Sequence, residues 1–282
     1  MTIVVSGATG QLGGRVVRLL DAAGARQRLI VRDPDRAPDV AHVELSTITS
    51  YTDAEGLARA LADAGPVLMV SAAESEDRLD QHRAFVDAAT AAGVPHLVYT
   101  SYYGASPDAT FTHGRLHAAT EDHIRASGVP FTFLRDNLYL DFLPDLAGAD
   151  GVIRGPGGSG AVSAVARDDV AEVASIVLQH PADHVGRTYD LTGPEELTLA
   201  GIAAKLTALT GRDVRYEEET LDEAFASRAS YGAPDWLVEA WISTYTAIAA
   251  GEMAGVSDAV PTITGHPATS LADLVARQRH EG

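Results

Sequence analysis

Residues 2–14 read Thr-Ile-Val-Val-Ser-Gly-Ala-Thr-Gly-Gln-Leu-Gly-Gly, a short β-branched run that breaks into glycines at Gly7, Gly10 and Gly13. The chain then continues into Arg15-Val16-Val17-Arg18-Leu19-Leu20, so this order predicts a strand, a tight turn and the N-terminus of a helix. The first amides of a helix have no partner inside the helix, and its dipole places partial positive charge there. A pyrophosphate can therefore bind against the bare backbone, which glycine allows it to approach closely.

The surroundings of this turn strengthen the interpretation. A glycine pattern alone is also compatible with an ordinary connection between a strand and a helix. Here a second β-branched strand, Arg28–Val31, follows the helix at the distance that a βαβ unit requires. The sequence therefore favours dinucleotide binding.

The first half of the chain alternates short apolar runs with helical patterns. Apolar periodicity predicts helices at about 11–22, 54–64, 77–92 and 113–127. Between them lie runs with the length and β-branched content of buried parallel strands. These runs are Ile3–Val5, Leu29–Val31, Val43–Leu45, Val67–Val70, His96–Thr100 and Phe131–Leu134. The pattern predicts an α/β fold with a Rossmann-type doubly wound parallel sheet.

The pattern loosens after the glycine-rich stretch 155–160, which predicts a flexible connection. We expect a dinucleotide-binding Rossmann domain over 1–150 and a smaller C-terminal α+β cap over 151–282, with some elements returning to the core. Amphipathic patterns predict cap helices at Thr198–Thr210 and near 220–229 and 234–251. In such folds the substrate lies between the cap and the cofactor.

Composition narrows the class of protein. With 282 residues, 46% hydrophobic and 21% charged, the chain has the profile of a soluble globular protein. No apolar run reaches the ~18 residues of a membrane helix, and no signal peptide opens the chain, so a cytoplasmic location is the default expectation. The absence of cysteine excludes disulfides, thiolate nucleophiles and zinc–thiolate sites. A formal net charge of −18 argues against a nucleic-acid partner.

The single lysine of the chain, Lys205, excludes one common reaction mechanism. Conventional short-chain dehydrogenases use a Tyr-x-x-x-Lys pair, in which the lysine lowers the pKa of the tyrosine and holds the ribose. Gly201 stands four residues before Lys205, so this pair is absent.

Several motifs, in order along nearly the whole chain, resemble the NmrA-like atypical short-chain dehydrogenases/reductases. They are Gly7–Gly13, Ile30–Pro34, Thr100–Ser101, Ala119–Glu121, Gly128–Arg135 and Tyr189–Gly193. The resemblance is nearest to the type 2 quinone oxidoreductase and triphenylmethane reductase branch. It implies a Rossmann fold, NADP(H) as the usual cofactor, and reduction of quinones, dyes or other conjugated acceptors. Some members of the family bind the nucleotide only to sense it.

Charge at the end of the second strand predicts the choice of cofactor. Sites for NAD place a carboxylate there to hold the ribose 2′-hydroxyl, whereas sites for NADP place an arginine that pairs with the 2′-phosphate. Arg32 occupies this position, and Arg36 could add a second contact. The alternative is that both are solvated arginines paired with Asp33 or Asp35.

Further cofactor contacts are expected where other strands end. The small residues Ser71–Ala73 would let the backbone pass under the ribose and diphosphate. Ser50 lies where the resemblance implies an aspartate near the adenine, so this contact differs from the family pattern. The predicted cofactor-binding residues are Gly7, Thr9, Gly10, Gln11, Leu12, Arg32, Ser50, Ser71, Ala72 and Ser101.

His113, His117 and Glu121 recur every four residues, so a helix places them on one face. The His-x-x-x-His spacing matches zinc sites, but Gly114 follows the first histidine where a glutamate would be needed, and we predict no metal. A solvated face with a His–Glu pair is a further alternative. By resemblance, His117 occupies the position of the lysine of isoflavone-reductase-like relatives, which implies a proton donor or a substrate-orienting group.

Two further segments are expected near the nicotinamide. The resemblance places Tyr102, at the end of the fifth strand, on the nicotinamide side. Relatives tend to read Arg-Asn-Gly-Trp-Tyr where this chain reads Arg135-Asp136-Asn137-Leu138-Tyr139, so the amide is shifted by one position. We expect Asn137 and Tyr139 to point into the pocket. The predicted catalytic residues are His117, Tyr102 and Asn137.

These observations predict an NADPH-dependent reductase that transfers a hydride to a quinone, enone or similar conjugated carbonyl or dye. Hydride transfer to such an acceptor needs mainly a dry and correctly shaped slot, and a weak acid suffices to protonate the reduced oxygen. The alternatives are a non-catalytic NADP-binding regulator or redox sensor, and an isomerase that uses bound NADP. We expect a small-molecule substrate, neither nucleic acid nor membrane as a partner, and a homodimer as one candidate assembly.

Overall fold

The computed structural model describes residues 1–41 and 43–281, which cluster into two compact units. The first unit comprises the described residues of Met1–Tyr102 together with His117–Arg135 and Arg167–Tyr189. The second comprises Tyr103–Leu116, Asp136–Ala166 and the chain from Asp190 onward. Both units therefore draw on separate stretches of sequence, and the division of roles near residue 150 stays a prediction.

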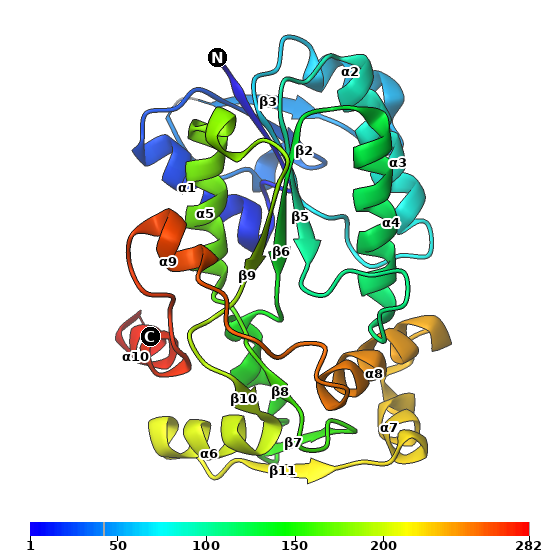
Figure 1. Ribbon diagram of the computed structural model, residues 1–282, viewed down its shortest axis with the longest axis vertical. Coiled ribbons are helices and arrows are strands. Elements are labelled where there is room, and N and C mark those ends of the chain that lie inside the picture. The colour runs from blue at the N-terminus through cyan, green and yellow to red at the C-terminus, as the bar shows by residue number, and fades with distance from the viewer. Residues whose placement is uncertain (42, 282) are drawn as a thin grey trace. The chain divides into compact units, whose positions relative to one another are not determined.

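A seven-stranded sheet runs through the structure in the order β3-β2-β1-β4-β5-β6-β9 (Figure 1). Its strands are β1 (Ile3–Ser6), β2 (Gln27–Val31), β3 (Val43–Thr47), β4 (Val67–Met69), β5 (Leu97–Tyr102), β6 (Phe131–Asp136) and β9 (Arg187–Leu191). Strand β1 pairs in parallel with β2 on one side and with β4 on the other. This is the order of a doubly wound dinucleotide-binding sheet, so the predicted fold class is confirmed.

Helices cover both faces of this sheet (Figure 1). They are α1 (Gln11–Ala22), α2 (Ala54–Leu61), α3 (Arg78–Ala91), α4 (Thr112–Ser127) and α5 (Arg167–Gln179). Helices α1 and α5 pack on each other over one face, and α3 and α4 cover the other. Strands β1 and β4 are wholly buried between these layers, which explains their continuous apolar runs. The short helices η1 (Pro34–Arg36) and η3 (Pro181–His184) lie in connections.

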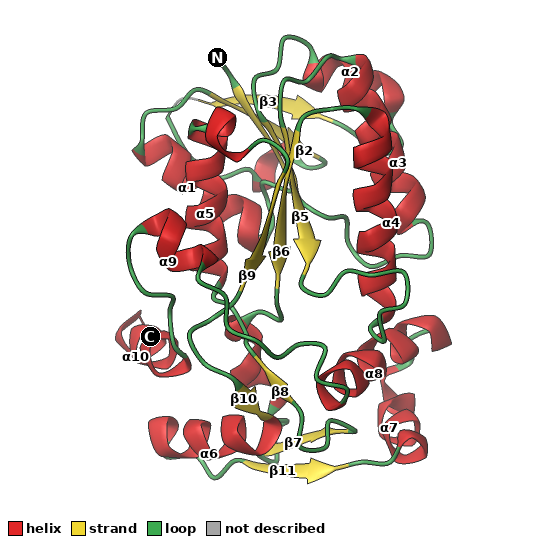
Figure 2. Cartoon of the chain, in the orientation of Figure 1, coloured by secondary structure: helices red, strands yellow, loops and turns green. Residues whose placement is uncertain are grey.

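The second unit contains short strands and further helices (Figure 2). Strand β8 (Ala161–Val162) pairs antiparallel with β10 (Leu197–Thr198), and β7 (Val152–Gly155) pairs in parallel with β11 (Arg215–Glu218). Its helices are η2 (Leu140–Leu146), α6 (Leu199–Thr210), α7 (Leu221–Arg228), η4 (Ala229–Tyr231), α8 (Asp235–Ala249), α9 (Ala259–Thr264) and α10 (Leu271–Glu281). Local capping explains where α7 begins, because Thr220 and Glu223 form a capping box there.

The glycine-rich stretch 155–160 is a closely packed turn between β7 and β8, which differs from the loose connection expected from the sequence. A side chain at Gly155 would collide with the ring of Tyr245, and one at Gly160 would collide with the backbone of Ile248. The glycines are required because other parts of the unit approach the backbone closely.

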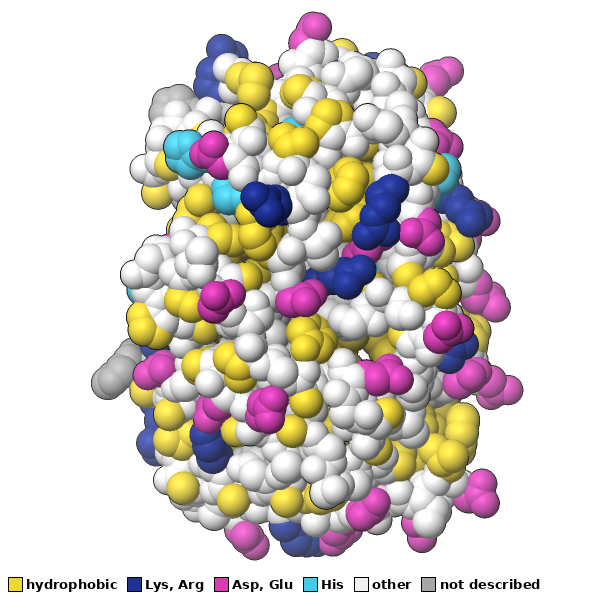
Figure 3. Space-filling view, viewed as in Figure 1, with side chains coloured by type: hydrophobic (Ala, Val, Ile, Leu, Met, Phe, Trp, Pro, Cys, Tyr) yellow, Lys and Arg dark blue, Asp and Glu magenta, His cyan; other side chains and the backbone are white. Residues whose placement is uncertain are grey.

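Acidic residues outnumber basic ones in the sequence, 39 to 21. Acidic groups are scattered over the face shown in Figure 3, with lysine and arginine interspersed among them. Across residues 1–41 and 43–281, the helices fall short of the length and hydropathy that a membrane span requires.

Candidate functional site

The glycine turn between β1 and α1 is built as the sequence predicts. Gly7 has a positive φ of 62° and its carbonyl accepts the Gly10 N–H at 2.9 Å, which closes the turn. A side chain at Gly13 would collide with the Gly7 carbonyl, so glycine lets the helix pack directly on the turn. Gly10 is the N-cap of α1 and gives no side-chain cap, and the first turn of α1 contains no acidic residue. The amides at this helix end are therefore suited to an anion.

A cavity of about 240 Å³ lies beside this turn in the first unit. Its lining includes Gly7 and Thr9 from the turn, Arg32 at the end of β2, and Ser50 after β3. Arg32 is exposed, and no ion pair joins it to a carboxylate among the residues that the structure describes. The exposed cationic group therefore stands at a recess that small polar residues line together with Ile30, Val31 and Ile48. Arg36 does not line this cavity.

Tyr51, which is not among the predicted site residues, has the largest side chain of the residues that line this cavity. Its hydroxyl lies 2.7 Å from Ser6 Oγ and 2.9 Å from the Val70 carbonyl oxygen, so it ties the ends of β1 and β4 together. Burial raises the pKa of Tyr51 to about 12, and the hydroxyl stays neutral at physiological pH. The residue shapes the floor of the recess. Its place next to Ser50 is a signal that the sequence carries.

Buried polar side chains accept hydrogen bonds from the backbone of the loop after β4. The Ser71 N–H donates to Thr100 Oγ1 at 2.9 Å, and the Ala72 N–H donates to His82 Nε2, also at 2.9 Å. Burial, reinforced by the charge of Arg78, lowers the pKa of His82 to about 3, so its ring is neutral. Since Nε2 accepts, the proton is on Nδ1, which donates to Thr120 Oγ1 at 3.0 Å. The backbone at the predicted cofactor positions Ser71 and Ala72 is thereby fixed.

His117 lies on α4 within the same buried polar cluster and is 5% exposed. Its Nδ1 is 2.8 Å from the Tyr99 hydroxyl, and its Nε2 is 3.4 Å from a guanidinium nitrogen of Arg78. The ring of Tyr102, at the end of β5, lies 6.0 Å from the His117 ring between centroids. Burial raises the pKa of Tyr102, so its hydroxyl is un-ionised. The structure thus brings two of the three predicted catalytic residues together.

Glu121 is the most heavily bonded member of the His113, His117 and Glu121 face. Its fully buried carboxylate accepts from both Nε and an Nη of Arg135, at 2.8 and 2.7 Å, and from Arg125 at 2.9 Å. It also accepts from the Ser101 hydroxyl at 2.6 Å. Ser101 therefore directs its side chain toward α4, and any cofactor contact would use its backbone. Among the described residues, no group of three His, Asp or Glu side chains is arranged to hold a metal.

Three side chains lie at the end of β6 and just after it, in the second unit. Asn137 is buried, and its amide donates to the Met253 carbonyl at 3.0 Å and accepts the Leu138 N–H at 2.8 Å. Its side chain thus anchors the chain here. Asp136 is 3% exposed, and the Tyr139 hydroxyl donates to its Oδ2 at 2.8 Å. Burial raises the pKa of Asp136 to about 8, although the bond from Tyr139 lowers it. Asp136 is not among the predicted site residues, because nothing in the local sequence indicates its burial.

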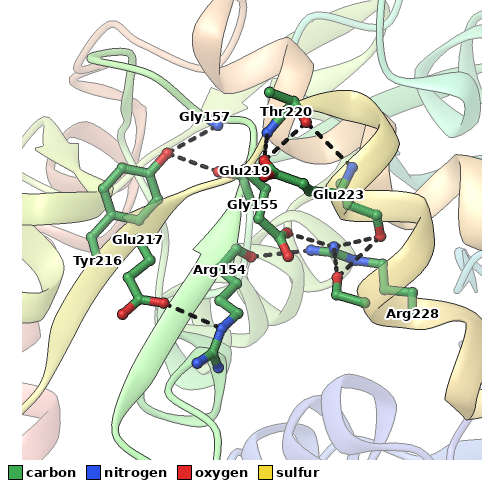
Figure 4. Close-up of polar contacts among 11 residues, drawn as sticks. Arg154, Gly155, Gly157, Tyr216, Glu217, Glu219, Thr220, Glu223 and Arg228 are labelled. Atoms are coloured by element: carbon green, nitrogen blue, oxygen red, sulfur yellow. Dashed lines mark hydrogen bonds and ion pairs between the residues drawn. The ribbon is translucent and has the colours of Figure 1, made fainter.

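A buried charged cluster around Arg228 and Glu219 holds elements of the second unit together (Figure 4). Arg228 on α7 pairs with Glu219 at 2.9 Å and donates to the Arg154 carbonyl at 3.1 Å. Its guanidinium also lies 5.3 Å from the centroid of the Tyr245 ring. Every hydrogen bond drawn in Figure 4 joins groups of the unit to one another, so this cluster connects β7, β11 and α7.

A family model described as NAD(P)H-binding matches residues 7–181. The chain belongs to this family. It is 33% identical over 276 residues to an NAD(P)H azoreductase of Xenophilus azovorans, covering 96% of both chains. The structure is similar to Escherichia coli quinone oxidoreductase QOR2 complexed with NADPH, with a TM-score of 0.90, 31% identity and coverage of 98% and 99% of the two chains. It is also similar to the Citrobacter sp. triphenylmethane reductase complexed with NADP(H), with a TM-score of 0.87, 32% identity and the same coverage.

Family membership agrees with the geometry of the recess. The glycine turn, the uncapped start of α1 and the cationic rim at Arg32 fit the diphosphate and phosphate groups of a nicotinamide dinucleotide. The protein is an NAD(P)H-dependent oxidoreductase, and the predicted resemblance to NmrA-like reductases is confirmed.

Proposed function

We propose that the protein is an NADPH-dependent reductase that passes a hydride to conjugated acceptors such as quinones, azo compounds or cationic dyes. Relatives that span nearly the whole chain carry the names azoreductase and quinone oxidoreductase, which supports this acceptor class. The observation that carries the choice of NADPH is Arg32 at the carboxyl end of β2, on the rim of the cavity beside the glycine turn. An arginine there is the group that recognises a 2′-phosphate.

A reaction without a Tyr–Lys pair is supported by the location of the single lysine. Lys205 lies on α6 in the second unit and forms an ion pair with Glu195. Its ion-pair partner belongs to the same unit. Reduction of a conjugated acceptor suits such a site, since the reduced oxygen or nitrogen is basic and a weak acid can protonate it.

The chain's own residues would divide the work as follows. The amides of Gln11 and Leu12 and the turn at Gly7–Gly10 bind the diphosphate, Arg32 binds the 2′-phosphate, and Ser50 borders the adenine. The backbone of Ser71, Ala72 and Ser101 passes under the ribose and the nicotinamide half. Bound NADPH supplies the hydride.

Two residues are proposed to act at the acceptor, and a third is proposed to position the chain. Tyr102 and His117 orient the acceptor and exclude water from it, and Asn137 holds the chain after β6 in position. His117→Ala is expected to lower turnover without weakening NADPH binding. His123→Ala, at a partly exposed position of the same helix, is the matched control. Unchanged kinetics in the His117 variant would remove its role.

The proposal is tested by following NADPH absorbance with a panel of quinones, an azo dye and a cationic triphenylmethane dye at neutral pH. We expect consumption of NADPH with at least one acceptor. Tight NADPH binding without turnover would favour a regulator, and conversion of a substrate without net NADPH consumption would favour an isomerase. The homodimer and the cytoplasmic location stay predictions of the sequence, for sedimentation and cell fractionation to test.

A further inference from the structure

Asp136 is a buried carboxyl group with one unused oxygen. It ends β6 and is 3% exposed, and its Oδ2 lies 2.8 Å from the Tyr139 hydroxyl. Its Oδ1 is buried and has no hydrogen-bond partner among the residues that the structure describes. A buried carboxylate with a single neutral partner is a costly arrangement, and such a group takes up a proton instead.

The cation next to Asp136 in sequence does not compensate its charge. Side chains alternate across a strand, so Arg135 and Asp136 point to opposite sides of β6. Arg135 makes a two-pronged ion pair with Glu121, on the side of α4. The pKa of Asp136 is accordingly raised by burial to about 8, and only the Tyr139 bond opposes this rise. At neutral pH the carboxyl group is protonated.

Protonation decides the direction of the bond between the two side chains. A proton on Oδ2 lets Asp136 donate to the Tyr139 oxygen, and the hydroxyl proton of Tyr139 is then available to another acceptor. Tyr139 is only partly buried, and it follows the carboxyl end of a strand, where open α/β sheets bind their ligands.

We propose that Asp136 and Tyr139 form a proton relay that supplies the proton taken up by the acceptor, in place of the missing Tyr–Lys pair. The relay rests on the proposed reductase function. When a quinone gains a hydride, its oxygen takes the hydroxyl proton of Tyr139, and an O–H bond forms as the Tyr139 O–H bond breaks. The proton on Asp136 Oδ2 moves to the Tyr139 oxygen, which leaves a carboxylate. Solvent reprotonates this carboxylate after the product leaves.

Different acceptors make different demands on this relay. A quinone or an azo compound needs one hydride and one proton for each two-electron reduction. A cationic triphenylmethane dye takes a hydride on its central carbon and becomes neutral, so it needs no proton. A loss of the relay therefore slows the first group selectively, whereas a misplaced nicotinamide or a damaged fold slows both.

The kinetic test compares these acceptors in Asp136→Asn and Tyr139→Phe. Asparagine has the shape of a neutral aspartic acid but no transferable proton. Each variant is expected to lower the rate with a quinone about 10²-fold relative to the rate with the cationic dye. The double variant should lose no more than either single one, because both residues serve one path. Asp145→Asn, at an exposed position of η2, is the control and should keep both rates.

A second measurement needs neither cofactor nor turnover. The infrared carbonyl band of a protonated carboxylic acid is expected in the wild type at neutral pH, absent in Asp136→Asn and present in Asp145→Asn. If the wild type reduces quinones but lacks this band, or if Asp136→Asn keeps the quinone-to-dye ratio, the relay is wrong while the proposed function stands. If the wild type reduces none of the acceptors, the proposed function fails and the relay with it, whatever the infrared band shows.

Discussion

A single guanidinium, that of Arg32, decides which nicotinamide dinucleotide this recess should prefer. It lies at the cavity rim without an ion-pair partner among the described residues, so it is ready for a dianionic phosphate. Charge-assisted hydrogen bonds contribute about 1.5–3 kcal/mol, and Arg32→Ala should therefore raise the Kd for NADPH about 10- to 100-fold. The Kd for NADH should change little, since NADH lacks that phosphate.

Fluorescence titration with both cofactors measures this difference. Arg36→Ala is the matched control, because Arg36 is exposed on the same connection and does not line the cavity. Equal losses of affinity for NADPH and NADH in the Arg32 variant would contradict the assignment.

The carboxyl of Asp136 should also be visible in the stability of the protein. Its pKa rises from an ordinary 3.8 to about 8 on folding, so between these values the folded chain holds a proton that the unfolded chain has released. The stabilisation is complete below about 3.8, falls as the pH rises, and is lost above about 8. The free energy of unfolding should decline relative to that of Asp136→Asn, by at most ~1.4 kcal/mol per pH unit.

Urea unfolding of both proteins over this pH range provides the measurement. Asparagine does not titrate, so the difference between the two curves isolates the one group. Parallel curves for the wild type and the variant would show that Asp136 is ionised in the folded protein.

A buried carboxylate on helix α4, that of Glu121, bonds to two strands of the sheet. Glu121 on α4 receives Ser101 from β5 and Arg135 from β6, and it also pairs with Arg125 within its own helix. Hydrogen bonds to charged groups contribute about 1.5–3 kcal/mol, and removal of Glu121 leaves arginines that are 22% and 44% exposed and can be solvated. Glu121→Ala should therefore lower the free energy of unfolding by about 1.5–3 kcal/mol.

The neighbouring Asp122 gives the comparison for this prediction. It pairs with the same Arg125 but is exposed, and exposed pairs contribute about 0–1 kcal/mol. Asp122→Ala should change the free energy of unfolding by less than about 1 kcal/mol. Similar losses in the two variants would mean that burial of the Glu121 network does not determine its contribution.

Elements were predictable from the sequence where local pattern and burial agree. Strands such as β1 and β4 are buried on both faces, so their apolar runs identify them directly. The two-residue strands β8 and β10 have no period to detect, and helix α9 is short and contains Pro261. Their existence depends on partners distant in sequence.

The residues of the candidate site also fall into those that the sequence predicts and those that depend on tertiary packing. The glycine turn and Arg32 carry their chemistry in the sequence, because a local motif and a strand end place them. The state of Asp136 depends on which way β6 faces and on Arg135 being committed to Glu121. The contacts of His82 and Arg78 with the loop after β4 and with His117 likewise arise only when α3 packs beside α4 and the sheet. No single-sequence pattern encodes these pairings.

At the scale of the whole molecule, an acidic protein has to bind an anionic cofactor. The formal net charge is −18, whereas the positive groups proposed to hold the cofactor are local: Arg32 and the N-terminus of α1. At 0.01 M salt the Debye length is about 30 Å, so an approaching NADPH is repelled by the net charge of the whole protein from that distance. At 0.1 M this length falls to about 10 Å, so only the local groups act at close range.

The association rate should therefore rise several-fold between these salt concentrations, and stopped-flow fluorescence can measure it. Dissociation should also become faster, because salt weakens the contact with Arg32, so the Kd should change less than either rate. An association rate that falls with salt would show that the cationic recess steers the cofactor from a distance, against the net charge of the protein.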